Sequence, residues 1–147
     1  MTTVKTVLEQ KPQPAAIICV GPHDAVVTAL QLMRDKRVRA VLVLDAGNLK
    51  GIITQGDCAI KVLLPGLDAK QVLVKDVMTL APVTVKLADP IEACTGLMAS
   101  RNFRHLPVME AGVVVGVVSI GDVVKDSIRQ MGQQINFLET YIKGHGA

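Results

Sequence analysis

Two short motifs in the chain have residue types suited to holding a phosphorylated sugar. They read Gly51-x-x-Thr54-x-x-Asp57 and Gly116-x-x-Ser119-x-x-Asp122. A hydroxyl at the start of a helix, where backbone N–H groups point outward, favours a phosphate group. A carboxylate one turn later can accept hydrogen bonds from ribose hydroxyls, and a glycine lets a ligand approach the strand backbone. The same spacing also fits a capping box, which satisfies the first N–H groups of a helix without any ligand. Both interpretations are open at the level of sequence.

A basic residue accompanies each motif. Arg39 and Arg104 each stand 15 residues before the hydroxyl of their motif, just ahead of an apolar stretch. A guanidinium facing the motif would supply a charge-assisted contact to phosphate. A capping box alone requires neither the arginine nor the glycine, so the arginines favour a ligand site. Asp24 and Asp89 also recur, but a role as helix N-caps explains them.

These features recur because the chain contains two copies of one unit. Residues 20–57 align with residues 85–122 at a constant offset of 65 and without an insertion. Two copies of a supersecondary unit normally pack against each other, so a site in one copy has a counterpart in the other. The search for function therefore narrows to polar residues that recur at the same place in both copies.

Each copy has the same sequence of expected elements. Stretches rich in β-forming apolar residues, apolar residues at helical spacing and the turn residues between them predict the order β-α-β-β-α, twice. The first copy is expected to have a strand over 15–20, a helix over 25–37, strands over 40–44 and 49–53, and a helix from 54 to before 65. The second is expected to have a strand over 83–85, a helix over 89–101, strands over 105–109 and 113–118, and a helix from 119. The connector predicts a short helical turn at 74–78. The fold class is α/β, with helices covering small sheets.

The C-terminal region predicts a long amphipathic helix. Its apolar residues are spaced 4, 3, 4, 3 and 4 positions apart: Val124, Ile128, Met131, Ile135, Leu138 and Ile142. Such a face needs a partner surface, which is either the rest of the same chain or a second copy in a homodimer. Val4, Val7 and Leu8 form a smaller apolar patch with the same two alternatives.

Composition excludes several classes of function. The chain has 147 residues, no Trp, one Tyr, two Phe and a formal net charge of +3. It therefore lacks both the aromatic platform and the strong positive charge typical of nucleic-acid binders. Cys19, Cys58 and Cys94 have no metal-ligand spacing, so we expect reduced, buried thiols. No signal peptide or membrane-spanning run is expected, and the predicted location is cytoplasmic.

The repeated residues resemble the cystathionine-β-synthase (CBS) domain. The resemblance rests on the two glycine–hydroxyl–aspartate motifs, on the segment Phe103-Arg-His-Leu-Pro-Val108 and on the lead-in Lys75-Asp-Val-Met-Thr79. The whole chain is similar to a stand-alone bacterial CBS pair, or Bateman module. The resemblance implies tandem repeats packed as a pseudo-two-fold pair with an extended C-terminal helix. Its expected boundaries are 13–66 and 78–131 for the repeats, 1–12 for an N-terminal segment, 67–77 for a connector and 132–147 for a C-terminal helical extension.

The resemblance also implies reversible binding of an adenosine ligand such as AMP, ADP, ATP or NAD between the repeats, with no required cofactor and no metal. Asp57 and Asp122 would hold ribose hydroxyls, and Thr54 and Ser119 would contact ribose or phosphate. The residues expected to face phosphates are Arg39, Arg104 and His105. The side chains expected to sandwich adenine are Val20, Ile53, Val85 and Val118.

The chain departs from the family pattern at several positions. Many members carry Glu-Arg between the hydroxyl and the aspartate, where this chain has Gln55-Gly56 and Ile120-Gly121. One phosphate-binding arginine is thus missing from each motif. Ala40 also stands where the second repeat has His105. The two sites are therefore expected to be unequal.

The sequence favours a regulatory ligand-binding module, not an enzyme. No nucleophile–base pair, metal cluster or paired carboxylate site recurs in the two copies. A nucleotide that prefers one arrangement of the repeats would shift their population, and a protein partner would respond to the change. The alternative is a constitutive dimerisation or scaffold module with vestigial clefts. A nucleotide hydrolase is a third possibility with little support in the residues.

Overall fold

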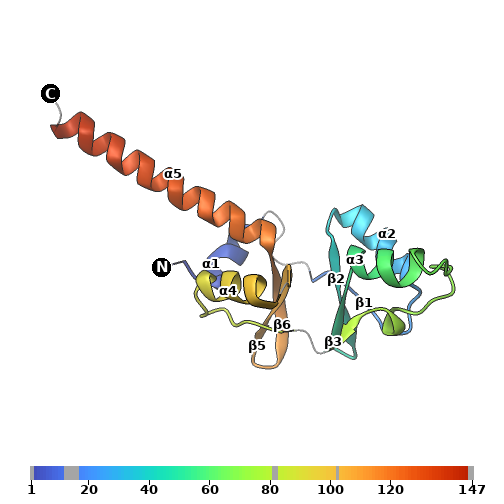
Figure 1. The fold of residues 1–147 in the computed structure, drawn as a ribbon. Helices are drawn as coiled ribbons and strands as arrows, with labels where there is room; N and C mark the ends of the chain where they lie inside the picture. The colour runs from blue at the N-terminus through green and yellow to red at the C-terminus, as the bar shows by residue number, and fades with distance from the viewer. Residues whose placement is uncertain (1, 12–16, 81–82, 102, 146–147) are drawn as a thin grey trace.

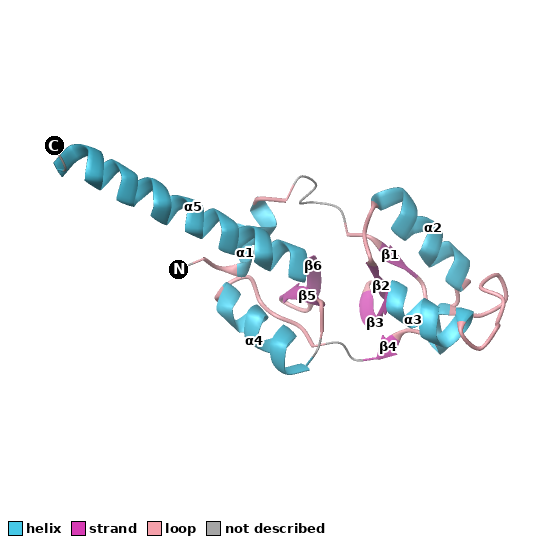
Figure 2. Ribbon diagram, turned by 45° about the horizontal axis from the view of Figure 1, so that its top comes forward, coloured by secondary structure: helices cyan, strands magenta, loops and turns pink. Residues whose placement is uncertain are grey.

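The computed structural model describes residues 2–11, 17–80, 83–101 and 103–145. The protein forms two α/β lobes side by side, one for each repeat, and a long C-terminal helix extends away from both (Figure 1). Figures 1 and 2 show the β-hairpin of each repeat on the side that faces the other repeat, with most helices farther out. Within the described ranges, no helix is both long and apolar enough to span a bilayer.

The first repeat contains a four-stranded sheet. Its elements are β1 (Cys19–Val20), α2 (Val26–Lys36), β2 (Ala40–Asp45), β3 (Asn48–Thr54), α3 (Gln55–Cys58), the π-helical continuation η1 (Ala59–Leu63), the 3-10 turn η2 (Val74–Asp76) and β4 (Thr79–Leu80). The strand order is β1-β2-β3-β4, in which β1 runs parallel to β2 and the other pairs are antiparallel. These elements confirm the predicted β-α-β-β-α order. The first part of the expected strand over 15–20 lies outside the described residues.

The second repeat follows the same plan. Its elements are α4 (Ile91–Arg101), β5 (His105–Glu110), β6 (Val113–Ser119) and α5 (Ile120–His145). Val85 forms a parallel bridge to Val108, which is the counterpart of the β1–β2 pairing. Both hairpin turns place an alanine and a glycine at positive φ: Ala46 (50°) and Gly47 (81°), then Ala111 (50°) and Gly112 (78°). Two successive positive φ values give a type I′ turn, whose twist matches the strands it joins.

The N-terminal segment belongs to the second repeat. It forms α1 (Val4–Glu9), whose apolar side chains Val4, Val7 and Leu8 are buried in the same core as Leu106 and Val118. The backbone N–H of Val4 donates to the carbonyl oxygen of Asp89 at 2.9 Å. The apolar patch at this end of the chain is therefore covered by its own chain.

Among the described residues, three clusters of buried apolar side chains hold the molecule together. Each repeat has a core between its sheet and its helices. A third, smaller cluster joins the repeats: Leu42 and Ile52 of the first hairpin pack with Val114 of the second, and Val117 lies against them. The hairpin faces that point away from the core of their own repeat thus form the contact between the repeats. The polar C-terminal ends of β3 and β6 lie at the border of this contact.

Asp24 and Asp89 are not N-caps, which corrects the prediction made from their type. Helix α2 is preceded by Ala25, which makes no side-chain cap. Its first N–H groups, from Val26 and Val27, donate to carbonyl oxygens of the connector at 2.9 Å. Each aspartate instead accepts a hydrogen bond from the N–H three residues earlier, at 2.8 Å in both repeats. A distant segment therefore caps the helix, and the aspartate stabilises the turn before it.

Candidate functional site

A cleft of about 240 Å³ opens between the two repeats. Its lining residues come from both of them: Arg39, Ile52, Thr54, Gln55, Gly56, Thr79, Phe103, Arg104 and His105. Four residues predicted from the sequence to bind a ligand, Arg39, Thr54, Arg104 and His105, meet here. Asp57, Ser119 and Asp122 do not line this cleft.

The backbone of each arginine is tied to the helix start of its own repeat. The carbonyl oxygen of Arg39 accepts from Gln55 N–H at 3.0 Å, and that of Arg104 accepts from Ile120 N–H at 2.9 Å. Both side chains are exposed, and among the described residues neither guanidinium has an ion pair or a hydrogen bond. Two unpaired like charges at one cleft attract an anion. Gly56, at the first turn of α3, also lines the cleft, and its N–H donates no hydrogen bond to the described residues.

Both glycine–hydroxyl–aspartate motifs form complete capping boxes. Asp57 N–H donates to Thr54 Oγ1 at 3.0 Å, and Thr54 N–H donates to Asp57 Oδ2 at 3.1 Å. The pair Ser119 and Asp122 repeats this geometry at 3.2 and 2.8 Å. The capping interpretation is therefore confirmed. It fixes the orientation of each hydroxyl and carboxylate, so capping preorganises these groups beside the hairpin ends.

The glycines of the motifs are explained by packing within the chain. A Cβ on Gly51 would lie 2.5 Å from the carbonyl oxygen of Thr79 in β4, and a Cβ on Gly116 would lie 2.9 Å from Leu8 Cδ1. The space that the sequence suggested for a ligand is filled by β4 in one repeat and by α1 in the other. Each glycine thus allows a neighbouring element to approach the hairpin.

The two carboxylates differ in their partners. Lys11 Nζ lies 2.8 Å from Asp122 Oδ2 and donates to the carbonyl oxygen of Val117 at 2.6 Å. Lys61 Nζ lies 3.6 Å from Asp57 Oδ1 and donates to Val77 O at 3.0 Å. The ion pair at Asp122 is the shorter and the more buried of the two. The surroundings of the two carboxylates thus differ through residues that lie outside the motifs.

His105 stands between the two motifs. It pairs with Ser119 across the second hairpin and also lines the cleft that contains Thr54. Burial lowers the pKa of the imidazole, and the charges of Lys11, Arg104 and Arg39 lower it further, while Asp122 opposes them. The lowered pKa keeps His105 neutral at pH 7. A phosphate beside it would favour the protonated form.

We expect the lowered pKa of His105 to make stability depend on pH. In the unfolded chain the imidazole takes up a proton below about pH 6.5, whereas in the folded protein it does so only at a lower pH. The free energy of unfolding should therefore fall as the pH drops through 6.5, and His105→Gln should remove this part of the loss. Urea unfolding at pH 7.5 and 5.5 measures it. His23→Gln, at an exposed position, is the control, and an equal loss in the parent and His105→Gln contradicts the assignment.

The four apolar residues expected to sandwich adenine lie in the cores of the repeats. Ile53 and Val118 have no exposed surface, and Val20 and Val85 are also buried. None of the four lines the cleft. The apolar residue of β3 that lines the cleft is Ile52. Neighbouring residues of a strand point to opposite faces, so Ile52 lies on the same face of β3 as Thr54, which also lines the cleft, and Ile53 lies on the opposite face.

Four further lining residues of the cleft, and the lysine that pairs with Asp122, were not among the residues predicted from the sequence. Phe103 precedes Arg104 within a quoted segment, and Thr79 ends the lead-in to the second repeat, so both had a signal in the family resemblance. Gln55 and Gly56 were considered only as departures from the family pattern. Lys11 had no signal at all, because its contact with Asp122 joins residues 111 positions apart and depends on how α1 packs.

The cysteines show no arrangement for catalysis or metal binding within the described ranges. Cys58 and Cys94 are buried, and burial raises the pKa of both thiols, to about 11 for Cys94. Cys19 is exposed, which corrects the expectation that all three are buried, because its side chain points away from the core that Val20 enters. No three His, Cys, Asp or Glu side chains of the described residues could together hold a metal ion.

Comparison with known proteins identifies the family. The family model for the CBS domain matches residues 13–63 and 74–129. The mitochondrial CBS domain-containing protein CBSX3 of Arabidopsis thaliana is 31% identical over 150 residues, which cover 97% of this chain and 73% of that protein. The crystal structure of the CBS domain protein NE2398 is 37% identical, with a TM-score of 0.81, and the match covers 86% of this chain and 98% of that one. The crystal structure of CBSX2 in complex with AMP is 26% identical, with a TM-score of 0.70 and coverage of 89% and 99%. The two lobes, their repeated hairpins and these matches together show that the protein belongs to the CBS-domain family and carries a tandem pair of CBS repeats.

Proposed function

We propose that the protein is a regulatory module that binds an adenosine nucleotide, of the AMP, ADP, ATP or NAD class, in the cleft between its repeats. The observation that supports this most is that Arg39 and Arg104, whose guanidinium groups have no ion pair with any residue that the structure describes, line one cleft. Thr54 and Gly56 line the same cleft, and a hydroxyl and backbone N–H groups at a helix start suit a phosphate. The AMP complex of the related protein CBSX2 shows that one member of this fold takes such a ligand.

In this proposal the phosphate lies between the two arginines, beside His105. Asp57 accepts hydrogen bonds from the ribose hydroxyls when the hairpin ends separate enough to admit them, and Ser119 and Asp122 do the same for a second nucleotide. Adenine packs against apolar side chains at the border of the inter-repeat cluster, where Ile52 is the nearest candidate.

The ligand acts by changing how the repeats are arranged. A phosphate that contacts Arg39 of one repeat and Arg104 of the other binds best when the two side chains converge, so it favours one relative position of the lobes. A protein partner that binds this arrangement more tightly senses the nucleotide, and by linkage it tightens nucleotide binding in return. The module is thus a cytoplasmic energy or redox sensor that works as a homodimer and does not itself catalyse a reaction.

Thermal shift tests the proposal with AMP, ADP, ATP and NAD at millimolar concentration. We expect at least one of them to raise the melting temperature of the parent and to lose most of this effect in Asp57→Ala or Asp122→Ala. Asp57→Asn is the matched control for folding, because its amide oxygen can still accept the Thr54 N–H. A ligand effect that survives both alanine variants contradicts the roles of the carboxylates, and release of product during incubation contradicts a purely regulatory role.

Binding of a second nucleotide at Ser119 and Asp122 is expected to be weaker because Lys11 pairs with Asp122. A ribose that binds there must displace an ion pair and a hydrogen bond, which costs about 1–2 kcal/mol. Lys11→Met keeps the length of the side chain but frees the carboxylate. We expect it to tighten the weaker of two binding events by about 5- to 30-fold.

Calorimetric titration with AMP measures this effect. Lys61→Met is the matched control, because Lys61 lies farther from its aspartate, and it should change affinity less. Weaker binding in Lys11→Met would show that the lysine contacts the ligand instead of blocking it.

A second candidate function is a constitutive dimerisation or scaffold module. The observations that favour it are the ion pair that fills the Asp122 site and the exposed apolar residues of α5. It predicts that none of the four nucleotides changes the melting temperature while the chain still self-associates. The same thermal shift experiment therefore separates the two functions.

A further inference from the structure

The C-terminal helix has an apolar face that its own chain leaves open. The six residues of this apolar stripe are each more than half exposed: Val124, Ile128, Met131, Ile135, Leu138 and Ile142. Most of the stability of a helix in a protein comes from packing of its apolar face. An exposed row of this length, about 27 Å at 1.5 Å per residue, marks an interaction surface.

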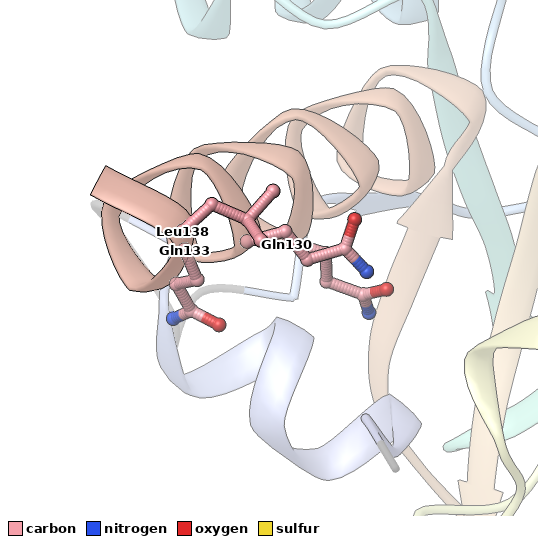
Figure 3. A pocket seen from close by; sticks show the side chains of 4 residues that line it. Gln130, Gln133 and Leu138 are labelled. Carbon is pink, nitrogen blue, oxygen red and sulfur yellow. The ribbon is translucent and has the colours of Figure 1, made fainter. Parts of the chain in front are cut away.

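The chain packs against a different face of α5. Val123 and Asp126 are buried, and Gln130 Nε2 donates to Thr2 Oγ1 and to Asp126 at 2.9 Å. At about 100° per residue, this face lies roughly 120° around the helix from the apolar stripe. The groove of about 510 Å³ along α5 is lined by Gln130, Gln133, Gln134 and Leu138, and Figure 3 shows these side chains along the helix. The stripe therefore stays accessible while α5 is anchored to its own repeat.

The stripe is symmetric about residue 133. Its spacing of 4, 3, 4, 3 and 4 is the same in both directions, so two antiparallel copies can bring every member opposite another member. In that register the layers are Val124 with Ile142, Ile128 with Leu138, and Met131 with Ile135, each formed twice. Such a contact is isologous, as expected for a two-fold dimer.

The charges beside the stripe favour the same register. Lys125 and Glu139 flank it on one side, in equivalent heptad positions 14 residues apart, and both are exposed. The antiparallel register places Lys125 of each helix beside Glu139 of the other, which gives two opposite-charge pairs. A parallel pair would place Glu139 beside Gln134 and gain no charge pair. Flanking charges of this kind set the orientation of paired helices.

We propose that the apolar stripe of α5 is covered by the α5 of a second copy of this chain, antiparallel and centred on residue 133. This inference specifies the interface of the homodimer in the proposed function, and it rests on the proposed function only for the dimeric state. The helix pairing does not involve the nucleotide cleft. In this dimer, the start of α5 in one copy, where the helix joins its repeats, lies beside the C-terminal end of α5 in the other copy.

Charge exchange tests the register. Sedimentation equilibrium of the full chain is expected to show a dimer, and Lys125→Glu or Glu139→Lys is expected to weaken it by about tenfold, because each turns two attractive pairs into two repulsive ones. The double variant Lys125→Glu/Glu139→Lys restores the pairs in reversed order and should return the dissociation constant to within about threefold of the parent. Glu92→Lys, at an exposed position of α4, is the control for net charge. A double variant no tighter than the single ones overturns the antiparallel register.

A second pair of variants tests the surface itself. Ile135→Asp should give a monomer, whereas Leu63→Asp, in the other exposed apolar group near Ile60 and Leu67, should leave the dimer intact. The reverse outcome, or a parent chain that is monomeric at about 100 μM, overturns the proposal. Circular dichroism checks that each variant is folded. The cleft lies within one chain, so the Ile135→Asp monomer should still bind nucleotide. Its nucleotide titration therefore distinguishes a failure of the α5 pairing from a failure of the proposed nucleotide site.

Discussion

Replacement of both Arg39 and Arg104 with alanine is expected to reduce AMP affinity by at least about 100-fold. Neither guanidinium has an ion pair within the described part of the chain, so each can make a charge-assisted hydrogen bond to phosphate worth about 1.5–3 kcal/mol. Each single variant should therefore lose about 10- to 100-fold. The losses in the double variant need not add, because both side chains contact the same phosphate. Isothermal titration calorimetry with AMP measures the dissociation constants.

The control for the arginine variants removes the same charge elsewhere in the first repeat. Arg34 is exposed on α2, where it pairs with Asp35 at 2.9 Å, so Arg34→Ala should leave AMP affinity within about twofold of the parent, as screening at physiological salt predicts. Adenosine, which lacks the phosphate, should bind the parent and the double variant with similar weak affinity. Equal AMP affinity in the parent and in the double variant would rule out a phosphate site at this cleft.

Gly51→Ala is expected to destabilise the protein by about 1–3 kcal/mol and to weaken nucleotide binding. The new Cβ would lie 2.5 Å from the carbonyl oxygen of Thr79 and 2.9 Å from Met78 Sδ, so β4 must move away from β3. Thr79 also lines the cleft, and its displacement should change the cleft as well as the core. Thermal unfolding should show a melting temperature lower by roughly 3–10 °C.

The pseudo-symmetric glycine gives a matched comparison. In Gly116→Ala the new Cβ meets the methyl groups of Leu8 at 2.9 and 3.1 Å, and a flexible side chain moves more easily than a backbone strand. We therefore expect a loss below about 1 kcal/mol, smaller than at Gly51. Gly96→Ala, in α4 with open space around it, should instead stabilise by up to about 1 kcal/mol. Equal losses at Gly51 and Gly116 would contradict the packing explanation.

The architecture could be predicted almost completely from the sequence because it depends on local patterns. These patterns are the β-forming apolar runs of β2, β3, β5 and β6, the Ala-Gly turns and the helical spacing of the C-terminus, each of which lies within a few neighbouring residues. Because the chain repeats at an offset of 65 residues, each element predicted in one repeat is also predicted at the matching place in the other. The antiparallel pairings, the long helix α5 and the capping boxes at Thr54 and Ser119 all appear in the structure.

The features that failed or were missed depend on contacts between distant segments. Asp24 looked like an N-cap, but carbonyl oxygens of the connector take that role. Ile53 was expected to face adenine, but it is buried in the core of the first repeat, and its neighbour Ile52 lines the cleft. The ion pair of Lys11 with Asp122 depends on α1 folding back onto the second repeat. The sequence predicted which residue types gather at the hairpin ends, but the different ion pairs of Asp57 and Asp122 arise from tertiary packing.

The most direct test of the central claim is a calorimetric titration of the parent protein with AMP and, separately, with adenosine. The claim is that the cleft between the repeats binds an adenosine nucleotide through its phosphate. It predicts saturable binding of AMP and at least about tenfold weaker binding of adenosine, the ratio expected from losing one or more charge-assisted contacts. Absence of AMP binding up to millimolar concentration, or adenosine binding as tight as that of AMP, would contradict it.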